Sequence, residues 1–308
     1  MYNPIRQVLD NKLNVRLKIF YFTLEMAKEE KMLQAFSNML YLKEGIRLDS
    51  KDLKSTRADK PVSKEVLDLI KKHKSYFREL EDTVEFVDSV RNPYGIYNFM
   101  RDYAKNNGIQ HKKKLEFVNN RTGEITERLV DDYYEPHDPE EYVIIIIDHI
   151  SLISQDSENG RKLSLHESIS KLSSEYLIRL RNKYGYIPVV VQQQSAAQES
   201  LENIKYNKLK PTLEGLGDNK LTGRDANVIL GLFSPFRHEI PQYYGYNIKQ
   251  FRDNIRFLEI IGGREGGGGT ICPLYFDGAV NFFKELPKPD NTAGMRQVEK
   301  LLKTIRNN

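Results

Sequence analysis

Cysteine and long apolar runs are almost absent from this 308-residue chain. The single cysteine, Cys272, excludes an internal disulfide framework and a zinc site built from cysteines, and it fits a reducing compartment. No segment approaches the roughly 18–20 consecutive apolar residues that span a bilayer. Residues 1–6 also lack the charged-then-apolar order of a secretory signal. These absences predict a cytoplasmic protein without a membrane segment.

An excess of one charge is missing as well. The chain has 47 basic and 43 acidic residues, so its net charge is only +4. A total this small does not demonstrate nucleic-acid binding, which is inferred from clustered basic residues. With 39% hydrophobic and 29% charged residues, the composition predicts a soluble protein with one large α/β domain or two small ones.

The last absence concerns nucleotide chemistry. Residues 143–147 form a short β-branched run that ends on Asp148, which is typical of a strand buried on both faces of a parallel sheet. Ligands bind beyond the carboxyl ends of such strands, and in nucleotide hydrolases an aspartate placed there holds Mg²⁺ against the phosphates. The loop that would cradle those phosphates, G-x-x-x-x-G-K-S/T, occurs nowhere in the chain.

Strand-like and helical segments alternate along most of the sequence. We expect strands at residues 17–24, 83–88, 143–148, 186–191, 226–232, 255–261 and 270–276. Helices are expected after the first strand to about residue 43, twice within residues 46–82 around Pro61, and at residues 94–106 and 164–183. This alternation predicts an α/β fold, a three-layer sandwich with a mostly parallel sheet.

Residues 111–142 interrupt the alternation. Strand-like runs flank a polar turn at residues 119–123, which predicts a hairpin inserted at the surface. We expect one domain over residues 1–286 that contains this insertion, and a linker with a terminal helix over residues 287–308. The tyrosine-rich stretch 241–246 is either a partner contact or local packing.

Two carboxylates are the first candidates for chemistry. Glu25 and Asp148 each close an apolar strand, and both emerge at one sheet edge if the strands are parallel neighbours. One could then coordinate Mg²⁺ through water while the other accepts a proton from the attacking water. The alternative for Glu25 is a place in the first turn of the next helix, where it would favour the macrodipole.

Polar residues after later strands are further candidates. Gln194 closes a glutamine run and could bond a terminal phosphate, unless that strand end merely faces solvent. Arg264 lies among the glycines of residues 262–269 and could reach a neighbouring subunit's active site, unless it is a mobile hairpin tip. His149 has no second histidine at metal-ligand spacing, so we assign it no ligand role.

Three basic residues stand in long polar loops: Lys162, Lys220 and Arg224. Basic loops that face a common axis would contact a nucleic-acid backbone, whereas isolated lysines usually face water.

Five segments occur in the order and spacing of one known family. Residues 22–26 read Phe-Thr-Leu-Glu-Met, residues 147–152 read Ile-Asp-His-Ile-Ser-Leu, and residues 188–194 end a strand in glutamine. Residues 216–227 and the glycine-rich residues 261–270 follow. Over roughly residues 15–285, apart from the insertion, the chain resembles the RecA-like motor domain of the DnaB-type replicative helicases.

The resemblance implies ATP and Mg²⁺ as cofactors. Asp148 would be the Walker B residue that positions Mg²⁺, and Glu25 would be the catalytic base. Gln194 would sense the γ-phosphate, and Arg264 would be an arginine finger acting across a subunit interface.

The implied partners follow from the same family. A homo-hexamer would encircle a single DNA strand in a central channel and unwind the duplex in the 5′-to-3′ direction, in a bacterial or phage-infected cell. Lys220 and Arg224, with Lys162 as a weaker candidate, would hold the DNA backbone. A primase and a helicase loader are possible further partners.

The departures from the family pattern matter. The family's lysine two positions before the finger is Gly262, and two Walker B positions hold His149 and Ser151. The family places its phosphate loop and the preceding strand about one helix upstream of Glu25. Either the chain starts at an internal methionine of a longer gene, or it has lost ATP binding.

We favour truncation, because the hydrolysis residues remain together. The alternatives are a non-catalytic DNA-binding or assembly module and a RecA-like recombination ATPase. The missing strand would leave backbone groups unpaired within the sheet. The chain alone is therefore expected to fold poorly or aggregate through that gap, and to hydrolyse ATP negligibly.

Overall fold

The computed structural model describes residues 13–54, 61–200, 202–203, 208–217, 219–264, 266 and 268–307. The chain divides into two compact units. Unit 1 comprises Met1–Lys28 and Ser75–Gln192, and unit 2 comprises Glu29–Lys74 and Gln193–Asn308. The single domain expected over residues 1–286 remains a prediction.

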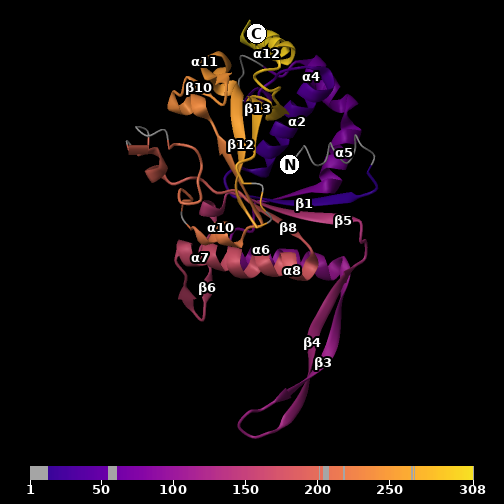
Figure 1. Cartoon of the computed structure of the whole chain (residues 1–308). Coiled ribbons are helices and arrows are strands. Elements are labelled where there is room, and N and C mark those ends of the chain that lie inside the picture. The colour runs from indigo at the N-terminus through magenta and orange to yellow at the C-terminus, as the bar shows by residue number, and fades with distance from the viewer. Residues whose placement is uncertain are drawn as a thin grey trace. The chain divides into compact units, whose positions relative to one another are not determined.

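Unit 1 is built on a parallel sheet in the order β2-β1-β5-β8 (Figure 1). The predicted α/β fold with a parallel sheet is thus confirmed. Its elements are β1 Arg16–Thr23, α5 Lys74–Thr83, β2 Val84–Val87, α6 Pro93–Asn106, β3 Gly108–Val118, β4 Ile125–Pro136, β5 Glu141–Asp148, β6 Ser157–Glu158, β7 Arg161–Lys162, α7 Leu165–Lys171, α8 Ile178–Tyr184 and β8 Ile187–Val190.

The two central strands form because their side chains are buried on both faces. β1 and β5 pair in register from Arg16↔Glu141 to Thr23↔Asp148. Phe20 and Ile145, which are partners in this register, are both buried. Burying a side chain of this size contributes about 1.5–3 kcal/mol, so this pair of strands anchors the unit.

One face of this sheet packs on α6 and on α7 and α8, which follow one another along a single long helix in Figure 1. The long helix begins with a capping box, in which Ser164 and Glu167 satisfy each other's backbone N–H groups. A π-helical stretch over Leu172–Leu177 joins α7 to α8. Gly185 ends α8 at φ 71°, a left-handed conformation that glycine adopts without strain.

β8 differs from the expectation of a buried strand at residues 186–191. It is the edge strand of the sheet, and Val189 is 42% exposed. Ile187 and Val191 are exposed on the same side, whereas Val190 packs on the core. The apolar run correctly indicated a strand, but burial on both faces requires a further neighbour, which the described residues do not supply.

The predicted hairpin insertion is present as β3 and β4, which pair with each other and with no other described strand. In Figure 1 the hairpin extends away from the sheet of unit 1. It starts at Gly108, three residues earlier than expected, because α6 ends at Asn106.

Unit 2 contains an antiparallel sheet in the order β14-β13-β12-β9, which the expectation of one mostly parallel sheet did not anticipate. Its elements are α2 Lys28–Glu44, α3 Ser50–Leu53, α4 Lys64–Lys72, α10 Leu221–Asp225, β9 Val228–Phe233, β10 Gln242–Tyr243, β11 Tyr246–Asn247, α11 Ile248–Phe251, β12 Ile255–Gly263, β13 Ile271–Asp277, β14 Phe282–Glu285 and α12 Thr292–Asn307. Three helices, α3, α4 and α5, replace the two expected within residues 46–82.

The C-terminal helix belongs to the core of unit 2. Leu302 of α12 is buried with Leu286, Phe257 and Tyr246. Tyr246 therefore supports the local-packing interpretation of the tyrosine-rich stretch, although Tyr244 is exposed. In the part of the chain that the structure describes, no helix combines the length and the hydropathy of a transmembrane segment.

Candidate functional site

The carboxyl ends of β1 and β5 bring Glu25 and Asp148 to one edge of the parallel sheet. Thr23 pairs with Asp148, and the Leu24 N–H donates to the Asp148 carbonyl at 2.9 Å. Asp148 is half-buried, and one of its carboxylate oxygens accepts a hydrogen bond from the Tyr21 hydroxyl. Glu25 follows one residue after Leu24 and is exposed. The expected common edge is therefore present.

Local hydrogen bonds hold the turn that carries Glu25. The Thr23 hydroxyl donates to the Met26 carbonyl, and the Arg91 guanidinium donates to the Leu24 carbonyl. The alternative place for Glu25, in the first turn of the next helix, is wrong, because α2 begins at Lys28 and its first-turn acids are Glu29 and Glu30. Glu25 thus lies in a turn that these hydrogen bonds hold in place, and its side chain faces solvent.

This edge fits part of a nucleotide site. Mg²⁺ keeps several waters and is usually held by one or two carboxylates together with substrate phosphates. Asp148 offers such a carboxylate, and the described residues contain no group of three or more His, Cys, Asp or Glu side chains that could hold an ion alone. Asp148 and Glu25 therefore fit the metal and water side, whereas the phosphate side has no loop in this sequence.

Two residues of this edge were missed from the sequence. Tyr21 lies on the same face of β1 as Thr23, and Thr23 is the register partner of Asp148. The alternation of side chains along a strand could therefore have placed Tyr21 near Asp148. Arg91 has no such signal, because 67 residues separate it from Leu24. Only the fold brings its guanidinium to the end of β1.

Gln194 lies in unit 2, beyond the end of β8. Its side-chain Nε2 donates to the Thr212 carbonyl at 3.3 Å, and the Thr212 N–H donates to its Oε1 at 3.4 Å. The expectation that residues 188–194 end a strand in glutamine is wrong for Gln194, because β8 ends at Val190 and Gln194 instead forms a bridge with Leu216. Its phosphate-sensing role remains a proposal.

Arg264 is exposed at the end of β12, where the glycine-rich connection to β13 begins. Its backbone N–H donates to the Asn227 carbonyl at 3.0 Å, and its Nη2 donates to the Arg224 carbonyl at 3.2 Å. Arg224 lies in the last turn of the short helix α10. Lys220 immediately precedes that helix, four residues before Arg224. Unit 2 thereby gathers Arg264, Arg224 and Lys220 into one basic cluster.

The remaining basic candidate, Lys162, lies in unit 1. It belongs to a two-residue strand that pairs with Ser157, and it is exposed. His149 is buried, and its Nδ1 meets no hydrogen-bond partner among the described residues.

No family model and no curated protein matches this sequence. Solved structures do match. A DnaB-like replicative helicase, described with its interactions with primase, superposes with a TM-score of 0.59 at 16% identity, over 89% of this chain and 52% of its own length. A second solved structure, itself an ATPase domain, gives 0.61 at 17% identity, over 92% of this chain and 79% of its own length. The chain thus spans about half the length of that DnaB-like helicase, and its fold is similar to the ATPase domains of DnaB-like helicases.

Proposed function

We propose that this chain is a motor segment of a DnaB-like replicative helicase, which couples ATP hydrolysis to movement along DNA. The observation that supports this best is the pairing of Thr23 with Asp148, with Glu25 two residues further on. Two carboxylates at the ends of adjacent parallel strands suit a Mg²⁺–nucleotide and its attacking water.

In this proposal Asp148 positions Mg²⁺ through water and Glu25 orients and deprotonates the attacking water. Arg264 neutralises transition-state charge at a neighbouring subunit, and Gln194 senses the terminal phosphate. Lys220 and Arg224, with Lys162, contact the DNA backbone. Bound Mg²⁺ and ATP would supply the electrophilic phosphorus and its charge neutralisation. Because the sequence has no phosphate loop, hydrolysis needs that loop from a further polypeptide segment.

The test of this proposal adds a phosphate loop to the chain. A strand, a G-x-x-x-x-G-K-S/T loop and a helix from a RecA-like ATPase are fused ahead of Met1, and DNA-stimulated ATP hydrolysis is measured. Glu25→Gln is expected to lower kcat by about 10²–10⁴-fold, and Arg264→Ala by about 10³-fold or more. Glu29→Gln, an exposed acid of α2, is the control. Full activity in Glu25→Gln would contradict the assignment.

A non-catalytic DNA-binding role is the second candidate, and the basic cluster of Lys220, Arg224 and Arg264 favours it. The unfused chain is titrated against a fluorescent single-stranded oligonucleotide at several salt concentrations. Replacing a phosphate-contacting Lys220 or Arg224 by Gln should reduce the salt slope by about one. Lys249→Gln, an exposed lysine of the same unit, should leave the slope unchanged. DNA binding with an inactive fusion would favour this second role.

A further inference from the structure

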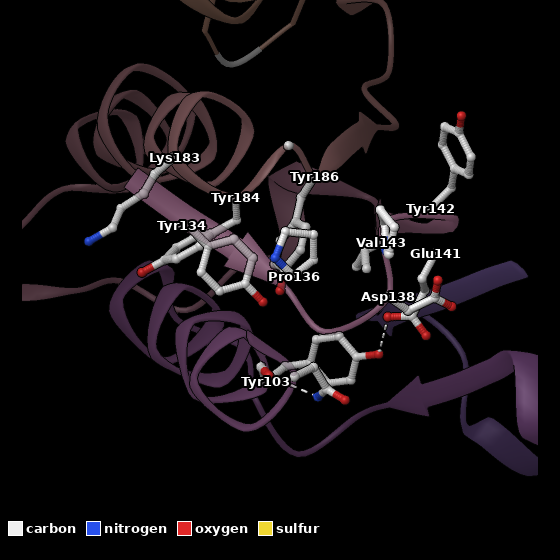
Figure 2. Close-up of a pocket in the computed structure, with 13 residues that line it drawn as sticks. Tyr103, Tyr134, Pro136, Asp138, Glu141, Tyr142, Val143, Lys183, Tyr184 and Tyr186 are labelled. Carbon is white, nitrogen blue, oxygen red and sulfur yellow. Dashed lines mark hydrogen bonds between the residues drawn. The ribbon is translucent and has the colours of Figure 1, made fainter. Parts of the chain in front are cut away.

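A second candidate site lies in unit 1 at the amino-terminal end of β5. A cavity of about 350 Å³ opens there between the end of α6, the base of the β3–β4 hairpin and the segment that joins α8 to β8 (Figure 2). Glu141 lines it and begins β5, whereas Asp148 ends the same strand. At about 3.3 Å per residue, the two carboxylates lie roughly 23 Å apart. The cavity is therefore separate from the candidate nucleotide edge.

The walls of the cavity are aromatic. Tyr103, Tyr134, Tyr184 and Tyr186 come from three different segments and line it together. The rings of Tyr134 and Tyr184 meet edge-on with centroids 5.0 Å apart, and those of Tyr184 and Tyr186 lie 5.6 Å apart. The Tyr134 hydroxyl donates to the Ala104 carbonyl at 3.0 Å, which fixes the hairpin base against α6.

Gly108 is required for this arrangement. A Cβ atom at that position would overlap the hydroxyl of Tyr134. The start of the hairpin therefore leaves room for the ring that closes one side of the cavity.

The charge at the cavity is acidic on one side. Glu141 accepts a hydrogen bond of 2.9 Å from the Tyr103 hydroxyl, so its partner is a neutral phenol. Asp138 also lines the cavity and forms an ion pair with Arg16. Lys183 is the basic residue of the lining; it pairs with Asp131, and its ammonium group lies 5.4 Å from the centroid of the Tyr184 ring. Glu141 thus brings a negative charge to the cavity beside a neutral partner.

One polar group in the lining is deeply buried. Tyr186 is only 4% exposed, and among the described residues its hydroxyl has no partner at full hydrogen-bond geometry. Burial raises the pKa of Tyr186, and so do the neighbouring Tyr134 and Tyr103, including a hydrogen-bonding contact with the Tyr134 side chain. A phenolic oxygen can both donate and accept, so the Tyr186 hydroxyl can still accept a bond from a ligand.

We propose that this cavity binds an alkylguanidinium or alkylammonium group. Tyrosine faces attract such cations through their ring quadrupoles, and the attraction is stronger where water is excluded. Glu141 supplies the opposite charge, and the Tyr186 hydroxyl can accept an N–H bond from the ligand. The group is either the side chain of an arginine or lysine in a partner protein, or a free polyamine-like cation.

The test uses the full chain and calorimetric titration. The peptide Gly-Arg-Gly and free agmatine are the cationic probes, and Gly-citrulline-Gly is the neutral isostere. Both cations, or one of them, should bind at least about ten times more tightly than the citrulline peptide, since charge-assisted bonds exceed neutral ones. Equal binding of the arginine and citrulline peptides, or no binding of either cation, would overturn the proposal. A peptide preference identifies a protein side chain as the source, and an agmatine preference identifies a free cation.

Variants locate the site. Glu141→Gln should weaken cation binding about tenfold or more, and Tyr186→Phe should weaken it several-fold. Glu140→Gln changes the exposed neighbouring acid, and Tyr133→Phe changes an exposed tyrosine that does not line the cavity; both should bind as the parent does. Unchanged binding in Glu141→Gln would contradict the assignment. Circular dichroism verifies folding, and the arginine–citrulline comparison on the parent chain stands even if a variant unfolds.

Discussion

The hydroxyl of Tyr21 donates a hydrogen bond to a carboxylate oxygen of Asp148 across the β1–β5 pair. This bond holds the half-buried carboxylate in place at the end of its strand. Tyr21 is itself nearly buried, and its ring packs near Phe86. Removing the hydroxyl should therefore remove this one bond from the carboxylate without removing the ring.

We expect Tyr21→Phe to lower the free energy of unfolding by about 1–2 kcal/mol, because a hydrogen bond to a charged group is lost. Urea unfolding followed by circular dichroism measures this change. Tyr142→Phe is the matched control, since Tyr142 is exposed and lies on the neighbouring strand. An equal effect of the two substitutions would show that the Tyr21–Asp148 bond contributes nothing.

The ion pair of Arg47 with Asp277 should be important to unit 2. Arg47 donates to both carboxylate oxygens, at 2.7 and 3.1 Å, and Asp277 is only 1% exposed. Arg47→Ala leaves a buried charge without its partner, which costs about 3–5 kcal/mol. A double-mutant cycle with Asp277→Asn should give a coupling energy above about 1 kcal/mol. Additive effects in urea unfolding would contradict the coupling.

The capping box of α7 predicts a dependence on acid. Hydrogen bonds from the Ser164 backbone and from Arg161 lower the pKa of Glu167 from 4.5 to about 2. A carboxyl with a depressed folded-state pKa contributes stability above pH 4.5, and that contribution is lost as the pH falls toward 2. The difference in melting temperature between the parent and Glu167→Gln should therefore shrink between about pH 5 and pH 2.

Glutamine retains the neutral bonds of the box, so this variant isolates the charge. Ser164→Ala, which removes the N-cap side chain, should cost about 1 kcal/mol and serves as the comparison. A melting difference that stays constant over the same acid range would show that the charge of Glu167 is not linked to folding.

The open edge of β8 leads to a prediction about solubility. Ile187, Val189 and Val191 form an exposed aliphatic row on an edge strand, and such edges pair with other chains. Val189→Lys should reduce concentration-dependent light scattering while the circular dichroism spectrum stays the same. Val190→Lys, on the opposite face that packs against the core, should unfold unit 1. Unchanged scattering in Val189→Lys would exclude this edge as the route of aggregation.

The sequence predicted the central strands well because their information is local. The β-branched run before Asp148 and the aromatic run before Glu25 show burial directly in their composition. Strand direction and edge position are not local properties. An apolar run such as residues 187–191 reads the same whether or not a neighbour covers it, so β8 was wrongly expected to be buried.

In the candidate site, too, local sequence places some residues, whereas only the fold brings the others together. The positions of Glu25 and Asp148 followed from strand ends, whereas the Tyr21–Asp148 bond joins residues 127 positions apart. Gln194 was placed on a strand because nothing in the glutamine run marks the end of β8 at Val190. The cavity tyrosines are scattered between residues 103 and 186, and no local motif relates them.

The β3–β4 hairpin allows a test of which part of the insertion contributes to the stability of unit 1. Lys112 and Asp131 are register partners, so residues 113–130 can be replaced by Asn-Gly, the preferred two-residue turn for a hairpin. The shortened chain keeps Tyr134, Pro136 and the Lys183–Asp131 ion pair.

We expect this replacement to change the free energy of unfolding by less than about 1 kcal/mol, because the removed pairs Lys113–Asp132 and Lys114–Glu127 are at the surface. A second deletion removes residues 109–135 at the base of the hairpin, and with them Tyr134 and its bond to Ala104. This deletion should destabilise unit 1 by several kcal/mol, because a large side chain leaves a packed site. Urea unfolding of the two shortened chains measures both effects. Equal stabilities would show that the tyrosines at the hairpin base do not support the fold, and the cavity they line would then be a surface feature rather than part of the structure of unit 1.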